Sequence, residues 1–276
     1  MTAASMSLLM AGLALGQVAA LDSETDPDRL QAAAVAIAVA GDAPSIAQLA
    51  RRLGDAAFLR RLDPPTASST PVVRVGRIFD ALREHPSQAA EALCLALSND
   101  AEFNSVLARR NGLLAVLAAR KPLSATAAAV LRDSARNGFV ETVGPLLARN
   151  RSARAMALLE ELLAEDALPA PQRIYVAHAA IVPNRNDREF VRLSARLIRR
   201  RGLARPVVYG IAESLFDYQP KAWFGASPDM PEPPPRSAAS PEVRKLLREL
   251  AAELRVRQDL PPSLPAAMRN TLAEIR

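Results

Sequence analysis

The sequence predicts an all-α protein built from stacked antiparallel helical hairpins, that is, an α-solenoid. Apolar residues recur at helical spacing along most of the 276 residues. Alternation of β-branched and aromatic residues with period two is nearly absent, which argues against sheets. Half of the residues are hydrophobic but only 4% are aromatic, so Ala, Leu and Val must form the core. Such a composition is typical of closely packed helices with small residues at their contacts.

The clearest hairpin runs from Gly138 to Glu165. Pro145 lies inside its first helix and is expected to bend that helix. Asn150 is suited to the left-handed conformation that ends a helix, and Asn150 or Ser152 can cap the second helix. Neither helix can bury its apolar stripe alone, so neighbouring hairpins must cover the remainder. The two stripes are Phe139, Val140, Val143, Leu146 and Leu147, and then Ala155, Leu158, Leu159, Leu162 and Leu163.

This hairpin resembles a HEAT repeat. The shared features are the proline in the first helix, the pair Leu146-Leu147, a short turn, and Arg154 early in the second helix. Residues 240–244, Ser-Pro-Glu-Val-Arg, resemble the start of a HEAT second helix, where Asp-Pro-x-Val-Arg is usual, and residues 187–192 are a looser version. The resemblance implies a right-handed helical solenoid that serves as a binding surface, and it carries over no catalytic residues.

The N-terminal residues 1–20 are expected to be a signal peptide. Met6 to Leu15 is apolar like an h-region, and Val18-Ala19-Ala20 supplies the small residues that a signal peptidase requires. No Lys or Arg precedes the apolar run, so an ordinary first helix or a mis-assigned start codon is the alternative. A cleaved chain would be periplasmic or secreted and an uncleaved one cytoplasmic. The apolar run is too short to span a membrane, so no integral span is expected in the mature chain.

Two parts are expected after this segment, an N-terminal helical cap at 21–62 and a helical repeat domain at 71–276. Asp26 followed by Pro27 predicts the first helix start of the cap. A linker rich in Pro, Ser and Thr, from Asp63 to Pro71, separates the two parts. Within the repeat domain, a proline-rich loop at 218–240 interrupts the array before the last helices.

The sequence shows no motif of catalysis. A glycine-rich phosphate loop, a Gly-x-Ser-x-Gly elbow and a His-Glu-x-x-His pair are all missing. We therefore expect a protein that is not an enzyme and that binds no cofactor and no metal. His85 and His178 lie far apart in the sequence and are interpreted as structural. Cys94, the only cysteine, lies between two leucines and is interpreted as a small buried hydrophobe.

The proline-rich loop contains the only tryptophan, Trp223, next to Phe224. We expect these two side chains to anchor the loop on the last helices, because a large aromatic residue usually finds apolar cover. The alternative is that the loop presents its Pro-x-x-Pro segment, residues 228–231, to a partner.

Positive charge is concentrated between Arg173 and Arg205, where nine arginines and only two acids occur. A helix is predicted from Asp187 to Arg201, and five arginines at steps of three or four residues would share one face. These are Arg185, Arg188, Arg192, Arg196 and Arg199. One interpretation is a solvated face that needs no partner. The other is a docking stripe for an acidic protein surface, an anionic lipid or a polyanion.

The function that these features favour is a non-catalytic scaffold for protein–protein interaction, located in the bacterial envelope if the signal peptide is cleaved. A nucleic-acid-binding HEAT-like protein is one alternative, although the net charge of +6 is modest for the length and nucleic acid is not the expected partner. An enzyme or lyase on a helical-repeat scaffold is the other.

Overall fold

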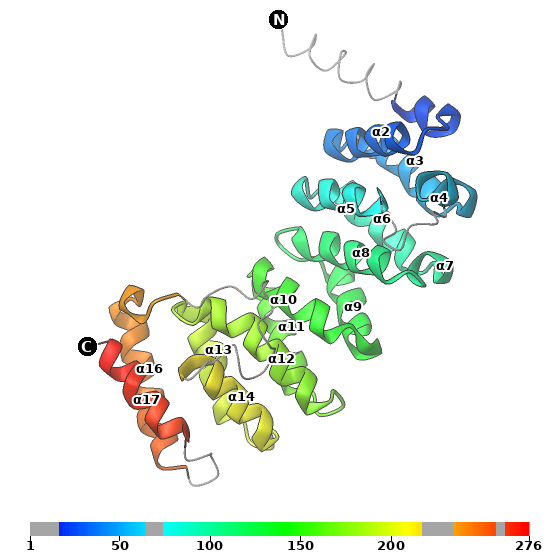
Figure 1. Ribbon diagram of the computed structural model, residues 1–276. Coiled ribbons are helices and arrows are strands. Elements are labelled where there is room, and N and C mark those ends of the chain that lie inside the picture. Colours follow the sequence, from blue (N-terminus) through cyan, green and yellow to red (C-terminus); the bar gives the residue numbers. More distant parts are fainter. Residues whose placement is uncertain (1–16, 65–73, 217–233, 258–262, 276) are drawn as a thin grey trace, which may run out of the picture. The chain divides into compact units, whose positions relative to one another are not determined.

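The computed structural model describes residues 17–64, 74–216, 234–257 and 263–275. These residues contain fifteen α-helices and no strand, so the prediction of an all-α protein is confirmed (Figure 1). Most of the expected signal peptide, together with Trp223, Phe224 and the Pro-x-x-Pro segment, lies outside the described residues. The chain divides into two compact units, Met1–Leu131 and Arg132–Arg276. The boundary falls inside a helix rather than in the linker at 63–71 that the sequence suggested.

In the first unit, each long helix packs on the next long helix but one, if the short helices α4 and α7 are left out of the count. Helix α2 contacts α5 and α5 contacts α8, while α3 contacts α6. The helices before the linker at 63–71 therefore pack directly on those after it. The helices are α2 (Pro27–Ala40), α3 (Ala43–Leu53), α4 (Ala56–Leu62), α5 (Arg74–Glu84), α6 (Gln88–Ser98), α7 (Ala101–Asn104) and α8 (Leu107–Ala119). Helix α9 (Ala125–Ser134) continues across the boundary into the second unit.

The predicted cleavage point after Ala20 lies within a helical stretch at 17–23. Leu21 in this stretch is buried in the first unit. The guanidinium group of Arg61 donates to the carbonyl oxygens of Leu21, Asp22 and Glu24 at 2.8 to 3.1 Å. All three acceptors follow Ala20, so a chain cleaved there would keep them.

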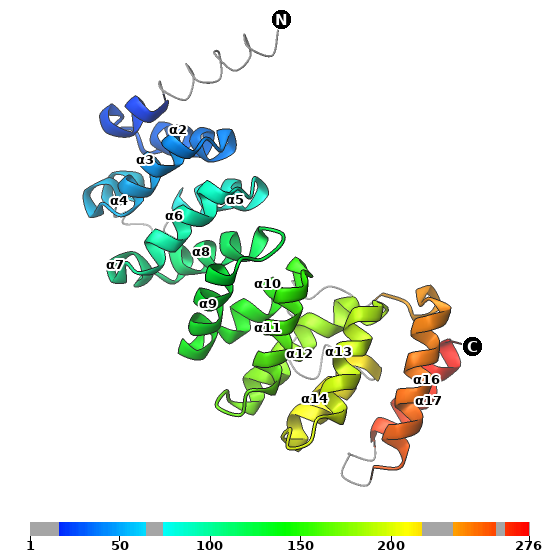
Figure 2. The ribbon, with the colours of Figure 1, turned by 180° about the vertical axis from the view of Figure 1, so that it is seen from behind.

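The second unit repeats the same order of contacts. Helix α10 contacts α12, α12 contacts α14 and α14 contacts α17, while α11 contacts α13 and α13 contacts α16. The helices thus form two layers, which both views show as neighbouring rows (Figures 1 and 2). The helices are α10 (Val140–Asn150), α11 (Ala153–Ala164), α12 (Ala170–Ile181), α13 (Arg188–Arg199), α14 (Arg205–Phe216), α16 (Pro241–Arg255) and α17 (Ser263–Glu274). Three short helices, η1 (Ala135–Phe139), η2 (Val182–Asn184) and η3 (Arg236–Ala238), connect them.

The predicted hairpin is present as α10 and α11, with one change at its turn. Pro145 lies inside α10 as expected, and the Ser152 side chain caps α11 by accepting from the Ala155 amide at 3.4 Å. The left-handed residue is Arg151, with φ of 60°, and not Asn150. Asn150 stays helical and buried, and its side chain accepts from the Ser152 amide at 3.0 Å. The helix therefore ends one residue later than the sequence suggested.

Most residues of the two predicted apolar stripes are buried. All five stripe residues of α11 are at most 2% exposed. In the first stripe the same holds for Val140, Val143 and Leu147 of α10, whereas Phe139 at the end of η1 and Leu146 of α10 remain partly exposed. Cys94 is also buried as expected, and burial raises the pKa of its thiol. The apolar pattern thus correctly identified the side of each helix that faces the core.

Glycines allow helices to approach closely within the layers of both units. A methyl group added at Gly144 of α10 would lie 2.4 Å from Cγ1 of Val176 in α12. One added at Gly210 of α14 would lie 2.9 Å from Ile174, also in α12. In the first unit, Gly112 of α8 meets the ring of Phe79 in α5 in the same way, at 2.9 Å. Each distance is shorter than real carbon atoms tolerate, so these contacts require glycine.

Candidate functional site

Helix α13 carries the arginines that the sequence singled out. The Asp187 side chain caps it by accepting from the Glu189 amide at 2.8 Å. Its apolar side is buried between the neighbouring helices, and the arginines lie on the other side, about half exposed. The helix ends at Arg199, two residues before the predicted end. The arginines on its outer side are Arg188, Arg192, Arg196 and Arg199.

Glutamates of the two adjacent helices pair with all four of these arginines. On the α16 side, Arg188 and Arg192 both contact Oε1 of Glu242, at 2.7 and 3.0 Å, and Arg199 donates from Nε to Glu253 at 2.8 Å. On the α11 side, Arg196 donates to Glu160 at 2.7 Å.

Two of these contacts shift a pKa. The hydrogen bond from Arg199 lowers the pKa of Glu253, and the hydrogen bond to Glu160 raises the pKa of Arg196. Each of the two shifts favours the charged form of the shifted residue.

Arg185 does not belong to this face, which corrects the expected five-residue stripe. It precedes α13 and donates from Nε and Nη2 to the carbonyl oxygen of Pro234, at 2.9 and 2.7 Å. The buried Arg236 lies beside it and donates to the Arg185 carbonyl oxygen at 2.8 Å. Burial, together with the charge of Arg185, lowers the pKa of Arg236 to about 9. These contacts attach the segment before α16 to the turn before α13.

The ion pairs continue on the other side of α11. Arg132 in α9 donates from Nε and Nη2 to Glu161 at 2.7 and 2.9 Å, and Arg136 in η1 donates to Glu165 at 2.8 Å. The outer side of α13 and α11 is therefore a network of pairs within the chain. This network favours the first interpretation of the arginines, a solvated face that needs no partner. Docking of an acidic partner on the stripe stays a prediction.

Replacing Glu242 by Gln is expected to lower the free energy of unfolding by about 1 kcal/mol, because one carboxylate serves two arginines. The pairs are exposed, so the loss should shrink as NaCl is raised to about 1 M. Urea unfolding followed by circular dichroism measures both effects. Glu141→Gln on α10 is the matched control, since this exposed carboxylate has no ion pair with the described residues. An equal loss in both variants would show that the network does not contribute.

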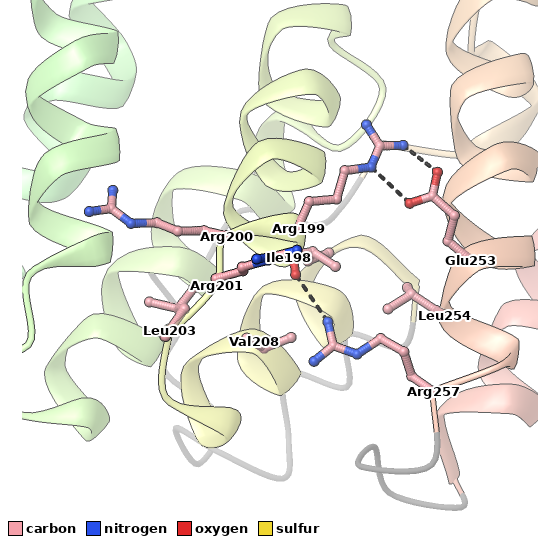
Figure 3. Close-up of a pocket in the computed structure, with 10 residues that line it drawn as sticks. Ile198, Arg199, Arg200, Arg201, Leu203, Val208, Glu253, Leu254 and Arg257 are labelled. Atoms are coloured by element: carbon pink, nitrogen blue, oxygen red, sulfur yellow. Dashed lines mark hydrogen bonds and ion pairs between the residues drawn. The ribbon is translucent and has the colours of Figure 1, made fainter.

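A pocket of about 380 Å³ lies at the C-terminal end of α13, between α13, α14 and α16 (Figure 3). In Figure 3, Arg199 points toward Glu253, and Arg257 points toward the carbonyl oxygen of Ile198, to which it donates at 3.0 Å. Arg257 thus stabilises the end of α13. The pocket is lined by Ile198, Arg199, Arg200, Arg201, Gly202, Leu203, Val208, Glu253, Leu254 and Arg257.

Arg200 and Arg201 differ from the arginines of the helix. Both are exposed, and neither has an ion pair or hydrogen bond from its side chain to the part of the chain that the structure describes. Figure 3 shows Arg200 extended to the side away from Glu253. There it also borders a second hollow on α11, next to Glu160 and Glu161. Both residues lie at the end of the helix predicted from Asp187 to Arg201, and their spacing alone does not distinguish them from the paired arginines.

A second polar cluster is buried between α12 and α14. The His178 ring lies 3.2 Å from Oγ of Ser214 through Nδ1, and 3.7 Å from Oε2 of Glu213 through Nε2. Ser214 donates to the Gly210 carbonyl oxygen at 2.7 Å, so its oxygen accepts from Nδ1–H of the imidazole. Burial lowers the pKa of His178 to about 4. The ring is fully buried, so this Ser-His-Glu arrangement is not open to a substrate.

The described residues, 17–64, 74–216, 234–257 and 263–275, contain neither a candidate metal-ligand cluster nor a candidate membrane-spanning helix. No group of three or more His, Cys, Asp or Glu side chains in them is placed to hold a metal ion. None of their helices combines the length and the apolar character that crossing a bilayer requires.

Comparison with known proteins gives no relative. No family model, no curated protein and no solved structure matches the chain.

Proposed function

We propose that this chain is a non-catalytic helical-repeat protein, similar to HEAT-repeat proteins, that binds a protein partner. The observation that carries the proposal is the pattern of contacts between helices. Each long helix packs on the next long helix but one, so that the helices form two layers. Stacked hairpins of this kind expose a long surface whose residues vary without disturbing the core, and such surfaces are used for binding. The hairpin α10–α11, with its internal proline, supports the likeness to HEAT repeats.

The location that we propose is the bacterial envelope, which rests on the apolar N-terminal segment followed by small residues. Intact-mass measurement of the protein purified from its native host tests this part. A mass that corresponds to a start near Leu21 is expected. A full-length mass would contradict export by cleavage and would favour the nucleic-acid-binding alternative.

Affinity capture from the native host, followed by reconstitution, tests the binding function. We expect one protein to co-purify in stoichiometric amount and to form a complex with the purified chain in size-exclusion chromatography with light scattering. A nuclease-treated sample should give the same result. Loss of the complex after nuclease treatment, or no stoichiometric protein at all, would contradict the proposal.

A further inference from the structure

We propose that the pocket at the C-terminal end of α13 binds an acidic, partly apolar segment of the protein partner. This inference rests on the proposed binding function and adds the chemistry of the partner. The inference is based on a difference in ion pairing between the arginines within α13 and the two arginines that directly follow its end. Arg188, Arg192, Arg196 and Arg199 are neutralised within the chain, whereas Arg200 and Arg201 are not.

The charge around the pocket is positive. Four arginines and one carboxylate, that of Glu253, line it, and this carboxylate is already bound to Arg199. Arg257 is held in place by its bond to the Ile198 carbonyl oxygen, which also offsets the negative end of the α13 dipole. A carboxylate entering the pocket would therefore meet guanidinium groups, which bind it through paired N–H donors.

The floor of the pocket is apolar. Ile198, Val208 and Leu254 are at most 3% exposed and form a rigid base from three different helices. A volume of about 380 Å³ accommodates one or two side chains. Leu203 in the lining is partly exposed, so an apolar side chain of the partner would contact Leu203 above this base while neighbouring carboxylates reach Arg200 and Arg201 at the edge. This combination fits a short peptide segment in which acidic and apolar residues alternate.

A nucleic acid fits this site less well. No aromatic side chain lines the pocket, so bases have no surface on which to stack. On the far side of Arg200, the second hollow is lined by Glu160, Glu161 and Glu165. Each of these carboxylates is paired with an arginine of the chain, so beyond Arg200 the lining of this hollow adds no unpaired guanidinium for a phosphate backbone to follow.

Fluorescence anisotropy with a short fluorescein-labelled peptide rich in Glu and Leu tests the site. We expect binding by the wild-type protein that weakens as NaCl is raised. The double variant Arg200→Glu/Arg201→Glu should bind about tenfold more weakly or worse. The matched control is Arg149→Glu/Arg269→Glu, which changes the net charge equally at two exposed arginines elsewhere in the second unit. A peptide with Gln in place of Glu should not bind.

Circular dichroism checks that both double variants are folded. Three results would overturn the inference: no binding of the Glu-rich peptide at low salt, equal weakening in both double variants, or tighter binding of a thymidine oligonucleotide than of the peptide. If the captured partner binds the Arg200→Glu/Arg201→Glu variant normally, the pocket inference fails while the proposed binding function stands.

Discussion

Replacing Gly144 by Ala is expected to lower the free energy of unfolding by about 2 kcal/mol. The added methyl group would lie 2.4 Å from Cγ1 and 2.9 Å from Cγ2 of Val176, at the contact between α10 and α12. Val176 is fully buried, and its β-branched side chain has little rotational freedom in a helix, so it cannot move aside. Alanine favours a helix over glycine by only about 1 kcal/mol, which the overlap exceeds.

Urea unfolding measures this loss, and the control is Gly76→Ala in α5. No heavy atom of a neighbouring residue lies within 4 Å of a methyl group added there, so this change should be neutral or stabilise the protein by up to about 1 kcal/mol. Val176→Ala should lower the free energy of unfolding less in the Gly144→Ala variant than in the wild type, because the two side chains compete for the same space. An equal effect of both glycine variants on the free energy of unfolding would contradict the close approach of α10 and α12.

The second large effect is expected on acidification. His178 is buried with its pKa lowered to about 4, while an imidazole in the unfolded chain has a pKa of about 6.5. Below pH 6.5 the unfolded chain takes up a proton that the folded chain excludes, so stability falls as the pH drops and stops falling near pH 4. The shift corresponds to about 3 kcal/mol.

Glu213 acts in the opposite direction. Its Oε2 lies 3.7 Å from Nε2 of His178, so a charged Glu213 favours the charged imidazole, whereas burial of the ring is what lowers the pKa of His178. Replacing Glu213 by Gln should therefore extend the acid-induced loss to lower pH.

Urea unfolding at pH 7, 5.5 and 4.5, compared between wild type and variants, isolates this contribution from that of the carboxylates. His178→Gln should reduce the loss of stability between these pH values, because the buried ionisable group is gone. His85→Gln is the control, since His85 is exposed and its replacement removes an imidazole without changing the buried cluster. A wild-type curve parallel to that of His178→Gln would contradict the assigned role of the buried ring.

What the sequence by itself determined is the local structure. The cap at Asp26, the internal Pro145 and most residues of the apolar stripes follow from contacts within one or two helical turns and were found where expected. Such features can be predicted from local spacing, because a residue in a helix contacts the residues three and four positions away along the chain. The all-α class follows from the same periodicity.

The tertiary structure decided which residues meet across helices. Arg196 pairs with a glutamate 36 positions away and Arg199 with one 54 positions away, so the unpaired charge lies at Arg200 and Arg201 and not on the predicted stripe. In the same way, His178 meets Ser214 36 positions later, and Gly144 meets Val176. These contacts depend on the register and crossing of neighbouring helices. Side-chain packing over the whole unit sets that register, so the apolar period of a single helix does not predict it.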